Sequence, residues 1–197
     1  IKLLKIYKKN HTLYYLIGTT YLQLKKQDLA IKYFKLSLKY NSNFPDTFNN
    51  LGVALAENKE YKEALTNYNK AIELKHDYID AYLNRGISLN KLKKYEEAIK
   101  DFNLVINKEP ENAKAFNNLG NVFKELKQFD KAVNFYDKAI KINDNFLEAI
   151  SNKSSIHYEK EEYSEALNCL KKIFKINPKF KGLIADIVTD KMCIFDW

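Results

Sequence analysis

Glycine recurs in this chain at a fixed interval of 34 residues. The period is marked by four glycines and, in its fifth copy, by a serine: Gly18, Gly52, Gly86, Gly120 and Ser154. Twelve residues after each of these places stands an alanine: Ala30, Ala64, Ala98, Ala132 and Ala166. A period of this length with small residues at two places is typical of a solenoid of stacked helix–turn–helix units. We therefore expect an all-α fold built from repeats.

The rest of each 34-residue repeat has the pattern of two helices. With the glycine at position 8, the repeats are 11–44, 45–78, 79–112, 113–146 and 147–180. Apart from Gln27, aromatic or aliphatic residues occupy positions 4, 17, 24 and 28, and three- and four-residue steps are the spacing of an amphipathic helix. The pattern predicts helix A at positions 2–14 and helix B at 17–30. We expect the small residues at positions 8 and 20 to let the two backbones approach closely.

These columns resemble the tetratricopeptide repeat (TPR) over residues 11–180. The resemblance implies a right-handed α-α superhelix, a TPR solenoid, whose A helices line a concave groove for protein or peptide ligands. Residues 1–10 align with positions 25–34 of an earlier repeat, and residues 181–197 carry apolar side chains at helical spacing. We expect the first segment to end a preceding partial repeat. The second is expected to form a capping helix and the junction to a missing domain.

A column of asparagines lies on the inner face of the predicted groove. At position 6 the chain has Asn50, Asn84, Asn118 and Asn152, with Leu16 in the first repeat. Positions 2, 6 and 9 of helix A share one face because they are three or four residues apart. An amide offers both a donor and an acceptor, so the column suits the backbone of a peptide in extended conformation. The alternative is that Asn is common in this chain and tolerated on a polar face.

The residue four positions earlier is acidic in three repeats. Position 2 holds Asp46, Asp80 and Glu148, whereas Lys114 takes this place in the fourth repeat. Each acid also lies in the first turn of a helix, where the helix dipole favours an anion, and this is a sufficient structural explanation for each acid alone. Together with the asparagines, the acids would suit ligand Lys, Arg, Ser or Thr side chains. Two further polar residues of the fourth repeat complete the candidate peptide-binding set: Asn117 and Asn121.

The distribution of charge argues against a nucleic-acid ligand. The net charge of +8 can indicate binding to nucleic acid or to an anionic membrane. However, positions 2, 5, 6, 9, 12 and 13 of the five A helices hold six acids and three bases, which gives the groove a charge of −3. The surplus lysines lie elsewhere, where they cannot meet a phosphate backbone in the groove. A general bias toward Lys, Asn, Ile and Tyr is the simpler explanation.

The sequence indicates neither catalysis nor a cofactor. His11, His76 and His157 fall in different repeats and form no cluster with metal-ligand spacing, and no Gly-rich phosphate loop or Ser/His/Asp signature occurs. We expect no enzyme activity from this chain, no metal and no cofactor. No apolar run reaches the roughly 18 residues that suggest a membrane span. The two cysteines form no Cys-x-x-Cys pair, which favours a reducing compartment, the cytoplasm.

The last repeat and the exit from it resemble a narrower family. The matching residues are Ser151-Asn152-x-x-Ser155-Ile156-His157, Asn177-Pro178-x-Phe180 and Asp196-Trp197. They are similar to the end of the TPR arm in O-GlcNAc-transferase-type glycosyltransferases, although Phe195 stands where that family tends to have Cys. The resemblance implies a substrate-recognition arm, with further repeats before Ile1 and a catalytic domain after Trp197. The alternative is a stand-alone TPR scaffold or assembly adaptor.

Overall fold

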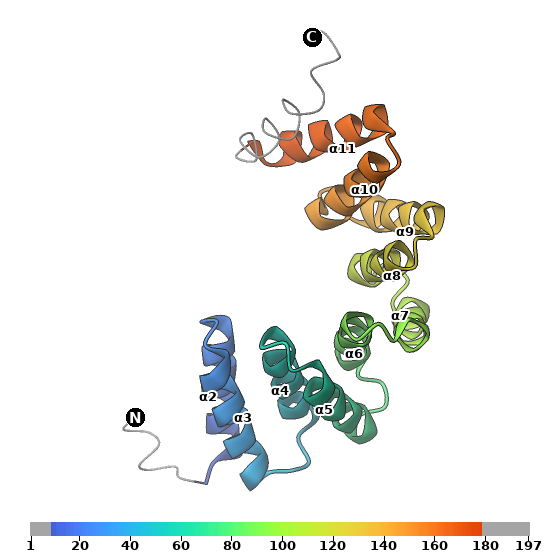
Figure 1. The fold of residues 1–197 in the computed structure, drawn as a ribbon. Coiled ribbons are helices and arrows are strands. Elements are labelled where there is room, and N and C mark those ends of the chain that lie inside the picture. The colour runs from blue at the N-terminus through green and yellow to red at the C-terminus, as the bar shows by residue number, and fades with distance from the viewer. Residues whose placement is uncertain (1–8, 179–197) are drawn as a thin grey trace. The chain divides into compact units, whose positions relative to one another are not determined.

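The computed structural model describes residues 9–178, which form ten α-helices with no strand among them. Figure 1 shows these helices following one another along the chain. The A helices are α2 (His11–Gln23), α4 (Pro45–Glu57), α6 (Ile79–Lys91), α8 (Ala113–Glu125) and α10 (Leu147–Glu159). The B helices are α3 (Gln27–Tyr40), α5 (Tyr61–Leu74), α7 (Tyr95–Lys108), α9 (Phe129–Ile142) and α11 (Tyr163–Ile176). Most of the predicted end of a partial repeat, and all of the predicted capping helix, lie outside the described residues.

The all-α prediction is confirmed, and the helix bounds differ from the prediction in helix A of each repeat. Helix B occupies positions 17–30 as expected, but helix A occupies positions 1–13 instead of 2–14. Three of the five early starts have a local explanation. Asn10 and Asn112 accept hydrogen bonds from the backbone N–H of Leu13 and Ala115, which satisfies an N–H group that a helix start leaves free. In α4 the first residue is Pro45, which has no N–H to leave unpaired.

The turn from helix A to helix B uses a left-handed residue in every described repeat. The φ angles are between 55° and 65° at Lys25, Lys59, Lys93, Lys127 and Glu161. The following residue then donates its N–H back to helix A, as Lys94 does to the carbonyl of Leu89 at 2.9 Å. This is the 6→1 bond of a Schellman motif, which usually places glycine at the left-handed position. None of the five residues is glycine, so each turn carries backbone strain.

Replacing Lys93 by glycine should therefore stabilise the protein by about 0.5–1 kcal/mol. A side chain in the left-handed region costs about 1–2 kcal/mol, and part of that gain is offset by the larger backbone entropy of glycine in the unfolded chain. Lys100→Gly, at an exposed place inside α7, is the matched control and should destabilise by about 1 kcal/mol. Urea denaturation of both variants measures the difference. Destabilisation by both changes would contradict the proposed strain.

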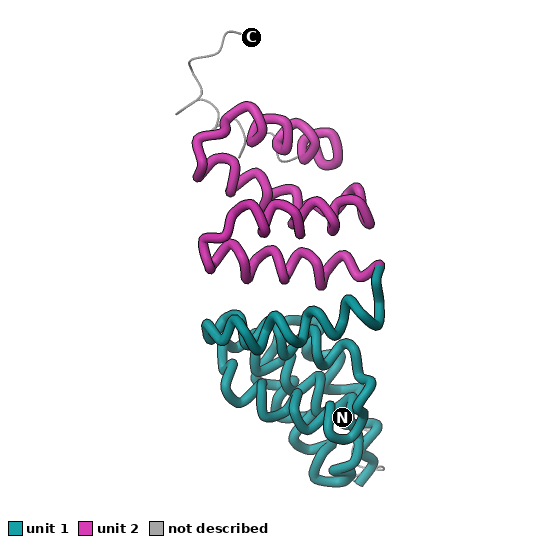
Figure 2. Tube along the Cα trace, turned by 90° about the vertical axis from the view of Figure 1, so that its right-hand side faces the viewer, with its two compact units in different colours: residues 1–110 teal, residues 111–197 magenta. Residues whose placement is uncertain are grey.

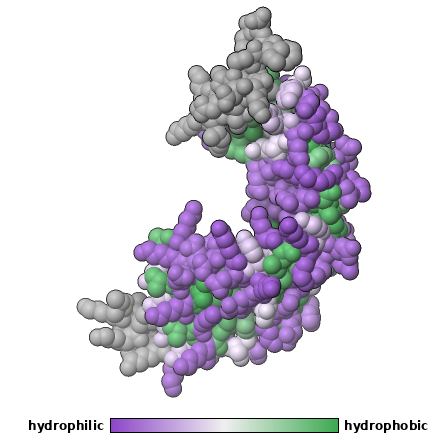
Figure 3. Space-filling model, viewed as in Figure 1, coloured by the Kyte–Doolittle hydropathy of each residue, from purple (hydrophilic) through white to green (hydrophobic). Residues whose placement is uncertain are grey.

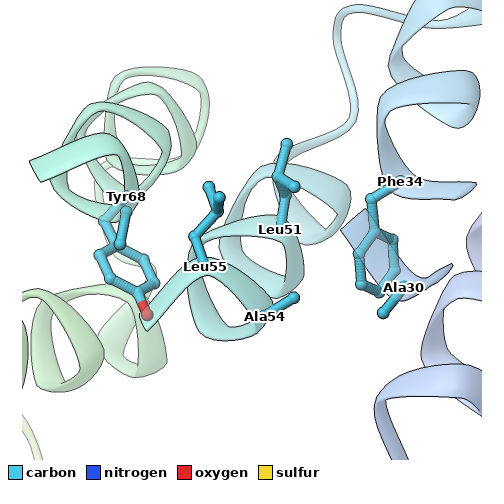
Figure 4. Close-up of a cluster of buried hydrophobic side chains, with 7 residues drawn as sticks. Ala30, Phe34, Leu51, Ala54, Leu55 and Tyr68 are labelled. Atoms are coloured by element: carbon cyan, nitrogen blue, oxygen red, sulfur yellow. The ribbon is translucent and has the colours of Figure 1, made fainter. Parts of the chain in front are cut away.

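The chain divides into two compact units, residues 1–110 and 111–197 (Figure 2). Each unit has its own buried core. In the first unit, Leu51, Ala54 and Leu55 of α4 lie between side chains of α3 and α5 (Figure 4). In the second unit a core cluster joins α9 and α10 through Ala139 and Ala149, both fully buried. Within a unit, each helix pair thus buries its apolar face against the next pair, as stacking of repeats requires.

The period-defining glycines make room for aromatic rings. A Cβ atom at Gly86 would lie 2.7 Å from a ring carbon of Phe102, and the same clash recurs at Gly18, Gly52 and Gly120 with the ring at position 24. At position 8 the neighbour that requires a small residue is therefore the ring at position 24 of helix B. The fifth repeat differs, because Ser154 and Leu170 occupy positions 8 and 24 there, and Leu170 is smaller than the aromatic residues of the other repeats. The hydroxyl of Ser154 donates to the backbone carbonyl of Ala166 at 3.2 Å.

Hydrophilic side chains cover much of the surface in the view of Figure 3, with apolar residues in smaller areas between them. The apolar residues at positions 20 and 24 are instead buried in most described repeats, as with Ala98 and Phe102, both 0% exposed. Among residues 9–178, no helix is both long and apolar enough to cross a membrane.

Candidate functional site

Consecutive A helices meet within each unit. α2 contacts α4, α4 contacts α6, and α8 contacts α10. Among the described residues, no two successive B helices contact each other to the same extent. The A helices therefore lie closer together than the B helices do. We call the surface formed by positions 2, 5, 6 and 9 of the A helices in each unit its A-helix wall. All ten predicted site residues belong to these two walls.

In the second unit, the wall contains a connected hydrogen-bond network. Asn152 of α10 donates from Nδ2 to Oδ1 of Asn117 at 3.1 Å and to Oδ1 of Asn121 at 3.0 Å. Asn117 is 1% exposed and donates to Oε1 of Glu148 at 2.9 Å. The hydroxyl of Tyr136 donates to Oδ1 of Asn121 at 2.7 Å. Four of the predicted site residues thus form one network that ties α8 to α10.

In the first unit, a second network runs through the wall from α6 to α2. Asn84 donates to Asn49 at 3.1 Å, Asn49 donates to Asn50 at 3.2 Å, and Asn50 donates to the hydroxyl of Tyr15 at 3.2 Å. Asn49 and Tyr15 were not among the predicted site residues. The signal that would have found them is their spacing, because each acceptor lies one repeat plus one residue before its donor on the next A helix.

The asparagines at position 6 therefore have a structural role that sequence reasoning missed. In three junctions the Nδ2 group of this asparagine contacts the residue at position 5 of the preceding repeat: Tyr15, Asn49 or Asn117. At least one N–H of each such amide is thereby used inside the protein. Asn118 is different, since it is half-buried and makes no hydrogen bond among the described residues.

The charged residues at position 2 are not equivalent. Asp46 is half-buried and accepts a hydrogen bond from the hydroxyl of Tyr78 at 2.8 Å. Burial, and then this carboxylate, raise the pKa of Tyr78 above its ordinary value, so the hydroxyl keeps its proton and donates. Asp80 and Lys114 are exposed and form no hydrogen bond or ion pair among the described residues. Both are therefore accessible to a ligand.

The A-helix walls are polar surfaces that can form hydrogen bonds. Residues 9–178 contain no group of three or more His, Cys, Asp and Glu side chains that could hold a metal ion. The A-helix walls present amide and carboxylate groups, and hydrogen bonds to the neighbouring repeat hold some of them, such as Asn84, Asn152 and Glu148. Such groups can accept or donate hydrogen bonds to a ligand without a large loss of side-chain entropy.

Comparisons with known proteins agree with this architecture. Tetratricopeptide repeat models match residues 11–44, 79–112, 113–146 and 147–180, and a TPR repeat model matches 54–93. Among curated proteins, none matches this chain.

Several solved structures share the fold. TTC0263, a thermophilic TPR protein of Thermus thermophilus, has a TM-score of 0.76 at 19% identity, covering 91% of this chain and 97% of that one. MamA of Desulfovibrio magneticus RS-1 has a TM-score of 0.73 at 22% identity, with 86% and 96% covered. YrrB, described as a TPR protein with an unusual peptide-binding site, has a TM-score of 0.65 at 19% identity, with 90% and 91% covered. From the repeat matches and this shared fold, the chain belongs to the tetratricopeptide repeat family.

Proposed function

We propose that this protein is an interaction scaffold that binds extended peptide segments along its A-helix walls. The observation that carries the proposal is the recurrence of an asparagine once per repeat on the A helices, at Asn50, Asn84, Asn118 and Asn152, each half-buried. A half-buried amide keeps part of its polar surface available to a ligand. Within each wall the asparagines recur at regular intervals, as the N–H and C=O groups of a peptide backbone do, so one extended segment can contact more than one amide. YrrB, which shares the fold, is a TPR protein with a peptide-binding site.

The hydrogen bonds between repeats support this proposal. They fix the amides before a ligand arrives, which lowers the conformational entropy that binding must overcome. They also leave the side-chain carbonyl oxygens of Asn84 and Asn152 without a donor among the described residues. With Asp80 exposed on α6, the walls are richer in acceptors than in cations. We therefore propose protein segments, and not nucleic acid, as the ligands.

Asn118 offers the cleanest test, because it makes no hydrogen bond inside the described part of the protein. Asn118→Ala should weaken the binding of a peptide selected on the full chain by about two- to tenfold, the loss expected for one hydrogen bond. Its free energy of unfolding should change by less than about 0.5 kcal/mol. Isothermal calorimetry and urea denaturation measure the two quantities.

The matched control is Asn134→Ala, which removes an exposed amide from α9, a B helix of the same unit. It should leave peptide affinity unchanged. Equal affinity of both variants for several unrelated selected peptides would show that the wall in the fourth repeat is not the binding surface.

We also propose, from the residues Ser151 to His157 and Asn177-Pro178, that the chain is the substrate-recognition arm of an O-GlcNAc-transferase-type glycosyltransferase. Only the motif supports this narrower function. The remaining part of the motif, Asp196-Trp197, lies outside the described residues. The test is the reading frame after Trp197. A glycosyltransferase domain there would support the arm, whereas a stop codon would leave the stand-alone scaffold or assembly adaptor.

A further inference from the structure

The amide network of the second unit ends on a group that can only accept hydrogen bonds. Glu148, at position 2 of α10, is exposed, and its Oε1 atom lies 2.9 Å from Nδ2 of Asn117. An ionised carboxylate has no proton to donate. Asn117 must therefore turn its N–H group toward Glu148, and its own carbonyl oxygen must point the other way.

The orientation of Asn117 determines the orientation of the next two amides, those of Asn152 and Asn121. The carbonyl oxygen of Asn117 can be satisfied only by a donor, which is Nδ2 of Asn152 at 3.1 Å. The second N–H of Asn152 then meets Asn121 at 3.0 Å, and the contact atom there must be the acceptor Oδ1. The same oxygen accepts from Tyr136 at 2.7 Å. Burial, followed by the charges of Glu148 and Glu125, raises the pKa of Tyr136, so this hydroxyl remains a donor.

Two polar groups of the network remain for a ligand, and one can only accept a hydrogen bond whereas the other can only donate. Asn152 has used both N–H donors and presents its carbonyl oxygen. Asn121 has used its carbonyl oxygen twice and presents its Nδ2 group, which has no partner among the described residues. An acceptor on α10 therefore stands beside a donor on α8. This pair is complementary to the N–H and C=O groups of a peptide backbone.

We propose that Glu148 is a positioning residue that fixes Asn152 as an acceptor and Asn121 as a donor toward a peptide backbone. The inference rests on the proposed function and assigns Glu148 a role other than contact with ligand side chains. The first unit has no such anchor in its described amide chain. That chain ends on the hydroxyl of Tyr15, which can accept or donate, so nothing there selects one orientation.

Glu148→Gln tests the inference, because a side-chain amide fits the same space but can accept or donate. The probe is a peptide selected on the full chain, together with analogues in which one backbone amide at a time is replaced by an ester. An ester lacks the N–H donor. In the wild-type protein, at least one ester should weaken binding about three- to tenfold. Glu148→Gln should bind the parent peptide more weakly and should lose most of this discrimination at the same ester.

Glu165→Gln is the matched control. It makes the same chemical change in the first turn of α11, a B helix outside the A-helix walls, where the exposed carboxylate anchors no amide among the described residues. It should keep the wild-type pattern of ester effects. An unchanged pattern in Glu148→Gln would overturn the inference while leaving peptide binding intact. If no peptide binds the wild-type chain, the proposed function itself fails.

A second measurement does not need a peptide. Hydrogen exchange of side-chain NH2 protons, followed by NMR, should show both protons of Asn152 protected in the wild-type chain and in Glu165→Gln. Glu148→Gln should expose at least one of them. Equal protection in all three proteins would overturn the positioning role, whatever the ligand.

Discussion

Gly86→Leu should destabilise the protein by about 2 kcal/mol or more. The first side-chain carbon alone would lie 2.7 Å from one ring carbon of Phe102 and 2.9 Å from another. Phe102 is fully buried, so its ring has no free space to move into, and overpacking of this kind costs about 1–3 kcal/mol or more. The helix propensity gained by replacing glycine, roughly 1 kcal/mol, offsets only part of this cost. Urea denaturation followed by circular dichroism measures the change.

Lys91→Leu, at the exposed end of the same helix, is the control and should change the free energy of unfolding by less than about 0.5 kcal/mol. Hydrogen exchange should show the damage of Gly86→Leu concentrated in α6, α7 and their immediate neighbours within residues 9–110, since repeats couple mainly to adjacent repeats. Uniform loosening of the whole chain, or no loosening, would contradict the repeat packing.

The fifth repeat suggests that the residues at positions 8 and 24 compensate for each other in size. There Ser154 and Leu170 occupy the places that Gly86 and Phe102 occupy in the third repeat. Gly86→Ser and Phe102→Leu should each destabilise, whereas the double variant should be more stable than the sum of the two single effects predicts. Additive effects would mean that the residues at positions 8 and 24 do not determine each other's size.

Asp101→Ala is the second change with a large expected effect, about 2–3 kcal/mol of destabilisation. Arg85 donates to Asp101 through Nε at 2.8 Å and Nη2 at 2.6 Å, and the aspartate side chain is only 7% exposed. Removal of the carboxylate leaves a half-buried guanidinium without its main partner. Breaking a fully buried pair costs about 3–5 kcal/mol, and the expected loss is smaller here because Arg85 is 23% exposed.

The second unit provides a control pair whose aspartate is exposed to water. Lys153 contacts Asp137 at 2.6 Å, but that aspartate is 51% exposed. Exposed pairs contribute about 0–1 kcal/mol, so Asp137→Ala should be nearly neutral in the same denaturation experiment. Similar losses for Asp101→Ala and Asp137→Ala would show that burial of the pair is not what gives Asp101 its importance.

The sequence predicted the fold because the relevant information is local and repeated. The spacing of Gly52 and Ala64, and of their equivalents, identifies two amphipathic helices in each repeat without any knowledge of distant contacts. The start of helix A was misplaced by one residue, because the spacing of apolar residues does not mark where a helix begins. In two repeats the side chain just before the helix, Asn10 or Asn112, caps it. The left-handed turn at Lys93 was not predicted, because lysine has no preference for that conformation.

The candidate site was only partly predictable. The sequence alone determined that Asn84, Asn118 and Asn152 occupy the same face of their helices, because a period of 3.6 residues fixes which side chains lie together. Only the tertiary structure decided which atoms of those amides remain available. Asn152 meets Asn117 and Asn121 across helices whose contacting residues are 31 to 35 positions apart in the chain, and Glu148 is proposed to fix their orientation. Hydrogen-bond partners between repeats depend on how one helix pair packs on the next, and no local sequence pattern specifies that packing.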